Sequence, residues 1–156
     1  MKTDKYYYTY NEFTKDLDIL EKKIKEFNPE AILAIARGGM TISHFLAERL
    51  NTKNLFSLNA SSYEDEKKVS KPVIFNIPDL SRYKKIALID DISDSGETLD
   101  EVVKTLKEKY PNIEIKSVTI FYKQNTKFMP EITLKEANKW IVFFWDKEGQ
   151  KIKEQK

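Results

Sequence analysis

Two adjacent carboxylates, Asp90 and Asp91, directly follow an apolar run and precede a short turn of small polar residues. In that turn Ser95 and Thr98 supply hydroxyl groups, and Gly96 lets a ligand approach the backbone closely. Amide groups at the start of a helix, together with the helix dipole, attract a phosphate. The two acids suit another partner, because carboxylates accept hydrogen bonds from a sugar diol or bind Mg²⁺. The segment therefore predicts a site for a phosphorylated sugar.

A third acid, Asp94, lies inside the turn, close to where the reacting carbon of such a sugar would be. The alternative interpretation is that Asp94 and Ser95 only cap the helix that follows. The apolar strand and double acid in front of the turn favour ligand binding, because open α/β sheets bind ligands at the carboxyl ends of their strands. The spacing of a Walker A phosphate loop is absent from the sequence.

Arg37, Gly38 and Gly39 follow a second apolar run, residues 31–36. Arginine is rare in this chain, occurring elsewhere only as Arg49 and Arg82. A guanidinium offers paired donors for phosphate oxygens, and adjacent glycines permit a backbone that exposes its amide groups. A plain strand-ending turn is the alternative, but beside the sugar-phosphate segment we favour phosphate binding.

The elements that must position these residues alternate between helices and short apolar strands. Apolar residues at spacings of three and four predict a helix over 10–27, with a capping box at its start. We expect further helices at 40–50 and 99–110, and strands at 31–36, 53–59, 73–77, 86–89, 113–121 and 140–145. Residues 61–71 are expected to form a loop. The alternation predicts an α/β fold with a mostly parallel central sheet flanked by helices.

Composition excludes several classes of protein. The 156 residues suffice for one domain, 1–156, and are too few for two ordinary ones. Without cysteine there is no disulfide framework, thiolate zinc site or cysteine nucleophile, and a Ser-His-Asp triad would need His44, the only histidine. A net charge of +2 does not call for nucleic acid.

Nothing in the sequence indicates a membrane or an export route. The charged start, residues 1–5, lacks the apolar core of a secretory signal. The longest aliphatic run, 31–36, is far shorter than the roughly 20 residues of a membrane span. We therefore expect a cytoplasmic protein.

Residues 90–98, with the sequence DDISDSGET, resemble the motif that binds 5-phosphoribosyl pyrophosphate (PRPP) in type I phosphoribosyltransferases. The resemblance implies that the 5′-phosphate is held by Ser95, Gly96, Thr98 and the amide of Glu97, whose carboxylate we expect to point away. It also implies that Asp90 and Asp91 hold ribose hydroxyls and Mg²⁺, with Asp91 as the metal ligand, and that Asp94 exchanges a proton near N7 of the base.

The resemblance extends from about residue 6 to 146 and is strongest to the 6-oxopurine branch of the family. It implies that Arg37 and Gly38 bind pyrophosphate, and that Ser62 and Tyr63 belong to a flexible loop over the site. It implies further that Lys123 donates to the purine O6, that Trp140 stacks on the base, and that the backbone of Ile141 reads its edge. The role of Asp146 stays open. Departures at 124–126 and at Val142 leave the choice of base open.

These features together predict a Mg²⁺-dependent purine salvage enzyme that transfers phosphoribosyl from PRPP to N9 of guanine, xanthine or hypoxanthine. We expect a hood formed by the N-terminal strand and about 123–146, and a homodimer or homotetramer. Two alternatives remain. A regulator could sense PRPP without turnover, and a phosphohydrolase would need aspartates in D-x-D spacing, which residues 90–92 lack.

Overall fold

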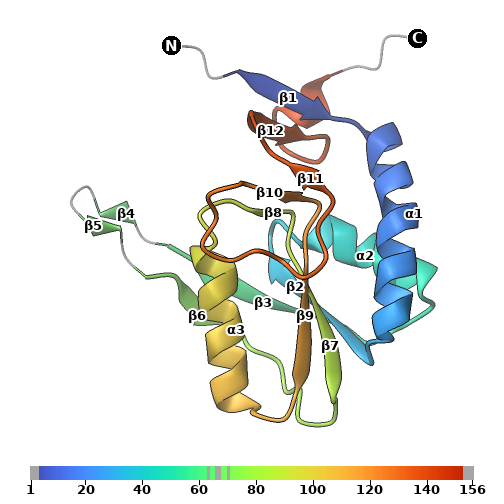
Figure 1. Ribbon diagram of the computed structural model, residues 1–156, viewed down its shortest axis with the longest axis vertical. Helices are drawn as coiled ribbons and strands as arrows, with labels where there is room; N and C mark the ends of the chain where they lie inside the picture. The colour runs from blue at the N-terminus through green and yellow to red at the C-terminus, as the bar shows by residue number, and fades with distance from the viewer. Residues whose placement is uncertain (1–3, 63, 66–67, 70, 153–156) are drawn as a thin grey trace.

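The computed structural model describes residues 4–62, 64–65, 68–69 and 71–152, and within them a five-stranded sheet forms the centre of the fold (Figure 1). The strand order is β6-β3-β2-β7-β9. β2, β3, β7 and β9 are parallel, and β6 joins the edge antiparallel to β3. The strands are β2 (Ala31–Ala36), β3 (Leu55–Ser61), β6 (Val73–Phe75), β7 (Lys85–Ile89) and β9 (Glu114–Val118).

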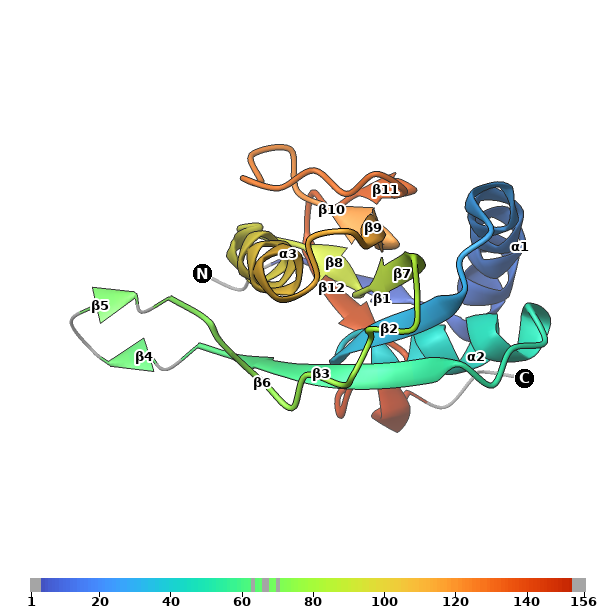
Figure 2. The ribbon, with the colours of Figure 1, turned by 90° about the horizontal axis from the view of Figure 1, so that it is seen from below.

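Helices cover both faces of this sheet (Figure 2). α1 (Tyr10–Phe27) and α2 (Met40–Arg49) pack on one face, and α3 (Glu97–Lys109) packs on the other. The strands supply both cores because successive side chains alternate between faces: Ile32 joins the first core, and Leu33 joins the second. This arrangement confirms the expected α/β fold with a mostly parallel sheet.

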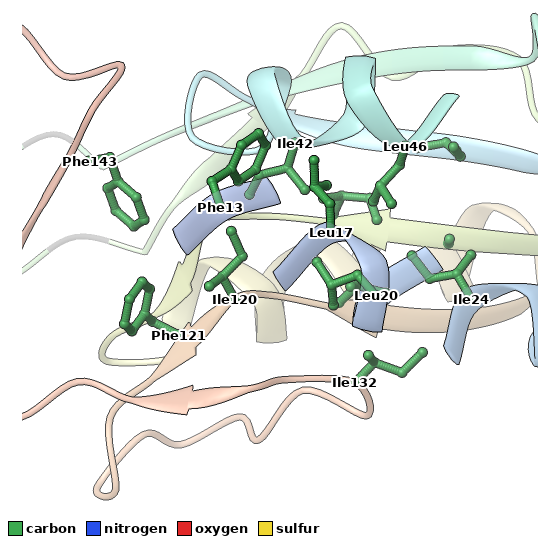
Figure 3. Close-up of a cluster of buried hydrophobic side chains, with 14 of the residues drawn as sticks. Phe13, Leu17, Leu20, Ile24, Ile42, Leu46, Ile120, Phe121, Ile132 and Phe143 are labelled. Atoms are coloured by element: carbon green, nitrogen blue, oxygen red, sulfur yellow. The ribbon is translucent and has the colours of Figure 1, made fainter. Parts of the chain in front are cut away.

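α1 has the bounds that its apolar spacing predicts. Thr9 Oγ1 accepts from the Glu12 amide, and the Glu12 carboxylate accepts from the Thr9 amide, which completes the expected capping box. At the other end Asn28 adopts the left-handed conformation and stops the helix. One apolar side of α1 packs against α2, β10 (Phe121–Tyr122) and β12 (Trp140–Phe143). The cluster is drawn in Figure 3 and includes Phe13, Leu17, Leu20, Ile24, Ile42, Leu46, Phe121 and Phe143.

The crossovers run in opposite directions from β2 and β7. From β2 the chain passes through α2 to β3 on one side, and from β7 it passes through α3 to β9 on the other. β2 and β7 are parallel neighbours, with Ala34 opposite Ile89. This reversal point is where open α/β sheets bind their ligands, beyond the carboxyl ends of the two strands.

The predicted strand 113–121 is split in the structure. β9 ends at Val118, and Phe121–Tyr122 form β10 in a separate small sheet between β8 (Ile92–Ser93) and β11 (Lys135–Glu136). The amides of Ile120 and Phe121 both donate to the Asp91 carbonyl at 3.1 Å, which turns the chain away from β7. The expected strand 140–145 ends earlier, as β12 (Trp140–Phe143), and pairs parallel with β1 (Lys5–Tyr8).

Within the expected loop 61–71, the described residues include two short strands. β4 (Glu64–Asp65) and β5 (Lys68–Val69) form a short antiparallel ribbon that projects from the body of the molecule (Figures 1 and 2). The two strands pair because of the sheet topology. β3 and β6 are antiparallel neighbours with Ser61 opposite Val73, so the segments that leave these two strands start side by side. The chain ends its described part in a short 3₁₀ turn, Gly149–Lys151. Among the described residues, no helix has both the length and the apolar character needed to cross a bilayer.

Candidate active site

The loops after β2 and β7 meet at the reversal point of the sheet. Arg37 and Gly38 follow β2, and Asp90 and Asp91 follow β7. The contact is tight, since a Cβ added to Gly38 would lie 2.7 Å from Oδ1 of each of the two aspartates. Gly39 is equally required, because its added Cβ would lie 2.1 Å from the Ile89 carbonyl oxygen. Its amide is already used, donating to the Ile35 carbonyl at 2.8 Å.

These loops form one wall of a cleft of about 930 Å³. The segment that follows β12 also lines the cleft and contributes Trp145, Asp146, Lys147 and Gln150. Thr98 lies at one end of the cleft, at the start of α3. The structure thus brings Arg37, Gly38, Asp90, Asp91 and Thr98 to one site, as the sequence predicts.

A hollow of about 60 Å³ lies at the N-terminus of α3, lined among others by Asp94, Ser95, Gly96 and Thr98. The helix begins two residues earlier than its apolar periodicity indicates, because Gly96 takes φ +85° and serves as the N-cap. The backbone amides of the first turn have no hydrogen-bond partner within the helix. They lie at the positive end of the helix dipole, which is the end beside this hollow. The geometry therefore suits a phosphate group.

A neighbouring segment closes the outer side of this turn. The Lys127 amide donates to the Ser95 carbonyl at 2.9 Å, and a Cβ on Gly96 would lie 2.5 Å from the Phe128 nitrogen. The carboxylate of Glu97 pairs with the Lys127 ammonium at 3.2 Å. Its charge is thus offset by a cation on the covering segment, and Glu97 is not among the residues that line the hollow.

A second cavity, of about 220 Å³, opens beside the cleft and shares Asp91 and Asp146 with it. Lys123 enters this cavity from the end of β10, and its ammonium lies 2.7 Å from the Asp94 carboxylate. Trp140 and Ile141 line it from the start of β12, and the Trp140 side chain is 57% exposed. A hydrogen-bond donor, an acceptor and an exposed aromatic face therefore surround one small space.

Comparison with known proteins decides the family. A model of the phosphoribosyl transferase domain matches residues 7–150, nearly the whole chain. The chain belongs to the phosphoribosyltransferase family. This confirms the resemblance that residues 90–98 carry.

Relatives of this phosphoribosyltransferase include a curated xanthine-guanine phosphoribosyltransferase of Nitratidesulfovibrio vulgaris, 26% identical over 147 residues, which cover 92% of this chain and 86% of the relative. Among solved structures, the xanthine-guanine-hypoxanthine phosphoribosyltransferase of Helicobacter pylori is 34% identical, with a TM-score of 0.87 over 94% of this chain and 97% of that one. A purine phosphoribosyltransferase from Pyrococcus horikoshii is 31% identical, with a TM-score of 0.79 over 92% and 94%.

The carboxylates of the phosphoribosyltransferase site resist ionisation. Burial, together with the neighbouring charge of Asp91, holds the pKa of Asp90 well above its usual value. Burial raises the pKa of Asp91 to about 6, and the charge of Asp146 adds to this effect, although the Ile92 amide donates to the Asp91 carboxylate at 2.8 Å. Crowded carboxylates of this kind gain stability when a cation neutralises them.

The donor set fits a magnesium ion that arrives with its phosphate ligand. Mg²⁺ is usually held in proteins by one or two carboxylates, while substrate phosphates and water complete its shell. Asp90 and Asp91 supply two such carboxylates, and one Oδ1 oxygen of each lies 2.7 Å from the position that a Cβ on Gly38 would take. Within the described residues no group of three or more acids, histidines or cysteines forms a closed metal site. The residues thus suit a shared ion better than a resident one.

Other residues that the sequence singles out do not line these cavities or lie outside the described residues. Ser62 is exposed just after β3, and none of the cavities described above is lined by it. Tyr63 lies outside the described residues, so the flexible lid stays a prediction. His44 is exposed on α2 and does not line these cavities either, which leaves no role for it in a triad there.

Sequence reasoning missed part of the site. Trp145, Lys147 and Gln150 line the cleft, and Lys139 lines the base-sized cavity. Asp146, whose role was open, lines both, and its carboxylate accepts from the Phe143 amide at 2.9 Å. The sequence did contain a pattern that could have indicated Asp146 and Lys147. The apolar run before them ends in a polar turn, as β2 and β7 do before their own site residues.

Proposed function

We propose that this phosphoribosyltransferase transfers the 5-phosphoribosyl group of PRPP to N9 of a 6-oxopurine, with Mg²⁺, and releases pyrophosphate. The observation that carries the proposal is the Lys123–Asp94 pair, 2.7 Å apart, in a small cavity beside the phosphate hollow and the acidic cleft. The names of the relatives from Nitratidesulfovibrio vulgaris and Helicobacter pylori support a purine with a 6-oxo group.

Base recognition follows from the chemistry of this pair. O6 and N7 are neighbours on one edge of a 6-oxopurine, so a donor beside an acceptor matches them. The Lys123 ammonium donates to O6 and cannot accept from a 6-amino group, which disfavours adenine. Asp94 accepts the proton of N7 or returns one there. Trp140 offers its exposed face to the flat ring, and Ile141 lies beside it to read the base edge by its backbone.

The sugar phosphate spans the rest of the site. The 5′-phosphate occupies the hollow formed by Ser95, Gly96, Thr98 and the amide of Glu97, while Asp90 and Asp91 hold the ribose hydroxyls. Arg37 and Gly38 bind the diphosphate. When bound through Asp91, Mg²⁺ would neutralise charge on the diphosphate. These groups bring the anomeric carbon close to N9 of the base, and positioning of this kind lowers the entropic part of the barrier.

The reaction balances without a further reactant. The bond between the anomeric carbon and the diphosphate oxygen breaks and leaves positive charge on the sugar, which N9 of the base then attacks. The purine loses one proton, which Asp94 takes up, and the diphosphate leaves with the electrons of its bond. The protein contributes position and electrostatic stabilisation rather than a covalent intermediate.

Several features remain part of this proposal. β1, β12 and the rest of 123–146 would act as a hood over the base in a single domain, 1–156. Ser62 and Tyr63 would belong to a lid that excludes water from the activated sugar. We place the reaction in the cytoplasm, with a homodimer or homotetramer as its assembly and with no membrane or nucleic-acid partner.

A panel of bases tests the proposal. Guanine, xanthine, hypoxanthine and adenine are each incubated with PRPP and Mg²⁺, and nucleoside monophosphate and pyrophosphate are followed together. We expect equal amounts of both products with at least one 6-oxopurine and little with adenine. Binding of PRPP without turnover of any base would instead identify a PRPP-sensing regulator. Release of inorganic phosphate from a monoester without any base would indicate a phosphohydrolase.

A further inference from the structure

We infer that Lys147, on the segment after β12, is a second cationic group for the diphosphate of PRPP and acts opposite Arg37. The inference rests on the proposed function and adds a residue to it from a part of the chain outside the motifs that sequence reasoning used. Arg37 and Lys147 both line the cleft of about 930 Å³, Arg37 from the loop after β2 and Lys147 from the segment after β12. We call these two residues the diphosphate clamp.

The backbone around Lys147 is tied down on both sides. Before it, the Asp146 carboxylate accepts from the Phe143 amide, and the Asp146 amide donates to the Phe143 carbonyl, both at 2.9 Å. After it, Glu148 accepts from the Lys5 ammonium at 2.8 Å and from the Tyr7 hydroxyl at 2.9 Å. Glu148 is thus held against β1, while its neighbour Lys147 lines the cleft.

The turn that follows adds to this rigidity. The Gln150 amide donates to the Asp146 carbonyl at 2.8 Å, and its side-chain nitrogen donates to the Trp145 carbonyl at 2.6 Å. A Cβ on Gly149 would lie 2.0 Å from the Phe143 carbonyl oxygen, so the turn packs directly against the end of β12. A lysine on such a support loses little backbone freedom when it binds a ligand.

The charges around the site favour Lys147 over the other nearby lysines. Lys123 pairs with Asp94, Lys127 with Glu97 and Lys139 with Asp4, each within 3.2 Å. Among the described residues, no carboxylate lies within ion-pair distance of Lys147 or of Arg37. These two groups can therefore bind an anion without first giving up a protein partner.

A phosphate ligand must bring a cation into this cleft, because the three acids that line it would repel a bare anion. Asp90, Asp91 and Asp146 all line it, and a single guanidinium would not offset them. A diphosphate with its magnesium ion uses both kinds of group, since the metal meets the acids and the phosphate oxygens meet Arg37 and Lys147. The 5′-phosphate hollow is built from other residues and is not affected by this clamp.

Calorimetry with two ligands tests the inference. Lys147→Ala should raise the Kd for magnesium pyrophosphate about tenfold, the size expected for one lost charge-assisted contact. The Kd for a nucleoside monophosphate, which has no diphosphate, should change less than about twofold. Lys147→Arg should restore most of the pyrophosphate affinity. The matched control is Lys151→Ala, four residues further on in the same segment, which should leave both Kd values unchanged.

Two results would overturn the inference. If Lys147→Ala binds magnesium pyrophosphate as tightly as Lys151→Ala does, Lys147 has no part in the diphosphate site. If Lys147→Ala weakens both ligands equally while Lys147→Arg restores neither, the residue supports the fold rather than the diphosphate. The proposed function fails separately, when the unsubstituted protein forms no nucleotide from PRPP and any base.

Discussion

The phosphate hollow and the base-sized cavity lie side by side but are assembled differently. The lining of the hollow comes from one continuous run, residues 90–99, at the end of β7 and the start of α3. The cavity takes its lining from separate stretches, at 91–94, 123, 139–143 and 146. The first region is a local strand–turn–helix unit, and the second exists only after β10, β12 and the loop after β7 have packed together.

This difference determines which kind of amino-acid substitution each region is sensitive to. A local unit is specified by its own backbone conformation, as the positive φ of Gly96 shows. A cavity assembled from distant segments depends on side chains that can change one at a time, such as the 57% exposed Trp140. Phosphate binding should therefore be sensitive to backbone changes, while base choice should be sensitive to side-chain changes.

The largest effect is expected at Asp94, which lines both regions. Asp94→Asn keeps the shape but removes proton transfer, so kcat should fall by about 100-fold or more, while the Kd for PRPP changes little. Steady-state kinetics and calorimetry measure the two effects, with Asp100→Asn on the outer part of α3 as the control. Normal turnover by Asp94→Asn would remove this residue from the mechanism.

Gly96→Ala tests the local region. The new Cβ would meet the Phe128 nitrogen and Thr126 Oγ1 at 2.5 Å, and the positive φ adds strain. We expect a loss of roughly 1–3 kcal/mol of unfolding free energy. The Kd for a nucleoside monophosphate should rise by more than about tenfold. Chemical denaturation and calorimetry report these changes, and Glu108→Ala, exposed near the end of the same helix, is the control. Unchanged nucleotide affinity would show that the hollow does not hold the 5′-phosphate.

Lys123→Ala tests the assembled region. The KM for guanine or hypoxanthine should rise about tenfold, because one charge-assisted hydrogen bond to O6 is lost. PRPP affinity should stay within about twofold, since the hollow is formed by other residues. The comparison uses Lys107→Ala, exposed on α3, as its matched surface lysine. Equal KM values for every 6-oxopurine in the two variants would end the assignment of Lys123 to the base.

The last effect concerns Asp91, which lines the base-sized cavity and the cleft. Its pKa is raised from 3.8 to about 6, so the folded chain binds this proton more tightly than the unfolded chain does. The contribution of Asp91 to stability without ligand should therefore fall as pH rises from about 4 to about 6 and then level off.

Asp91→Asn removes this dependence. Above pH 6 its melting temperature should exceed that of the unsubstituted protein by several °C, and near pH 4 the two should agree. Thermal melting across this range measures the difference. With magnesium pyrophosphate present the order should reverse, because the unsubstituted protein then gains from the bound cation. A constant difference at all pH values would contradict the raised pKa.

Much of the fold could be read from local patterns. The bounds of α1 follow from its apolar spacing and capping box, and β2 and the core of β7 follow from unbroken apolar runs. The apolar periodicity could not predict the early start of α3, because its first two residues, Glu97 and Thr98, are polar. The helix begins there because Gly96 adopts the conformation of its N-cap. The split of the predicted strand 113–121 could not be predicted from the sequence either. Val118, Ile120 and Phe121 are all buried apolar residues, and they differ only in the hydrogen-bond partners of their backbones.

The amino-acid sequence alone determined the family and the strand, acids, turn and helix proposed to bind phosphate, because these elements are neighbours in the chain and their chemistry is local. Only the tertiary structure decided that Lys123 meets Asp94, that Asp146 lines two cavities, and that Lys147 lines the same cleft as Arg37. Those relations depend on how β10 and β12 pack against the sheet, and long-range packing is set by the whole core rather than by any one segment.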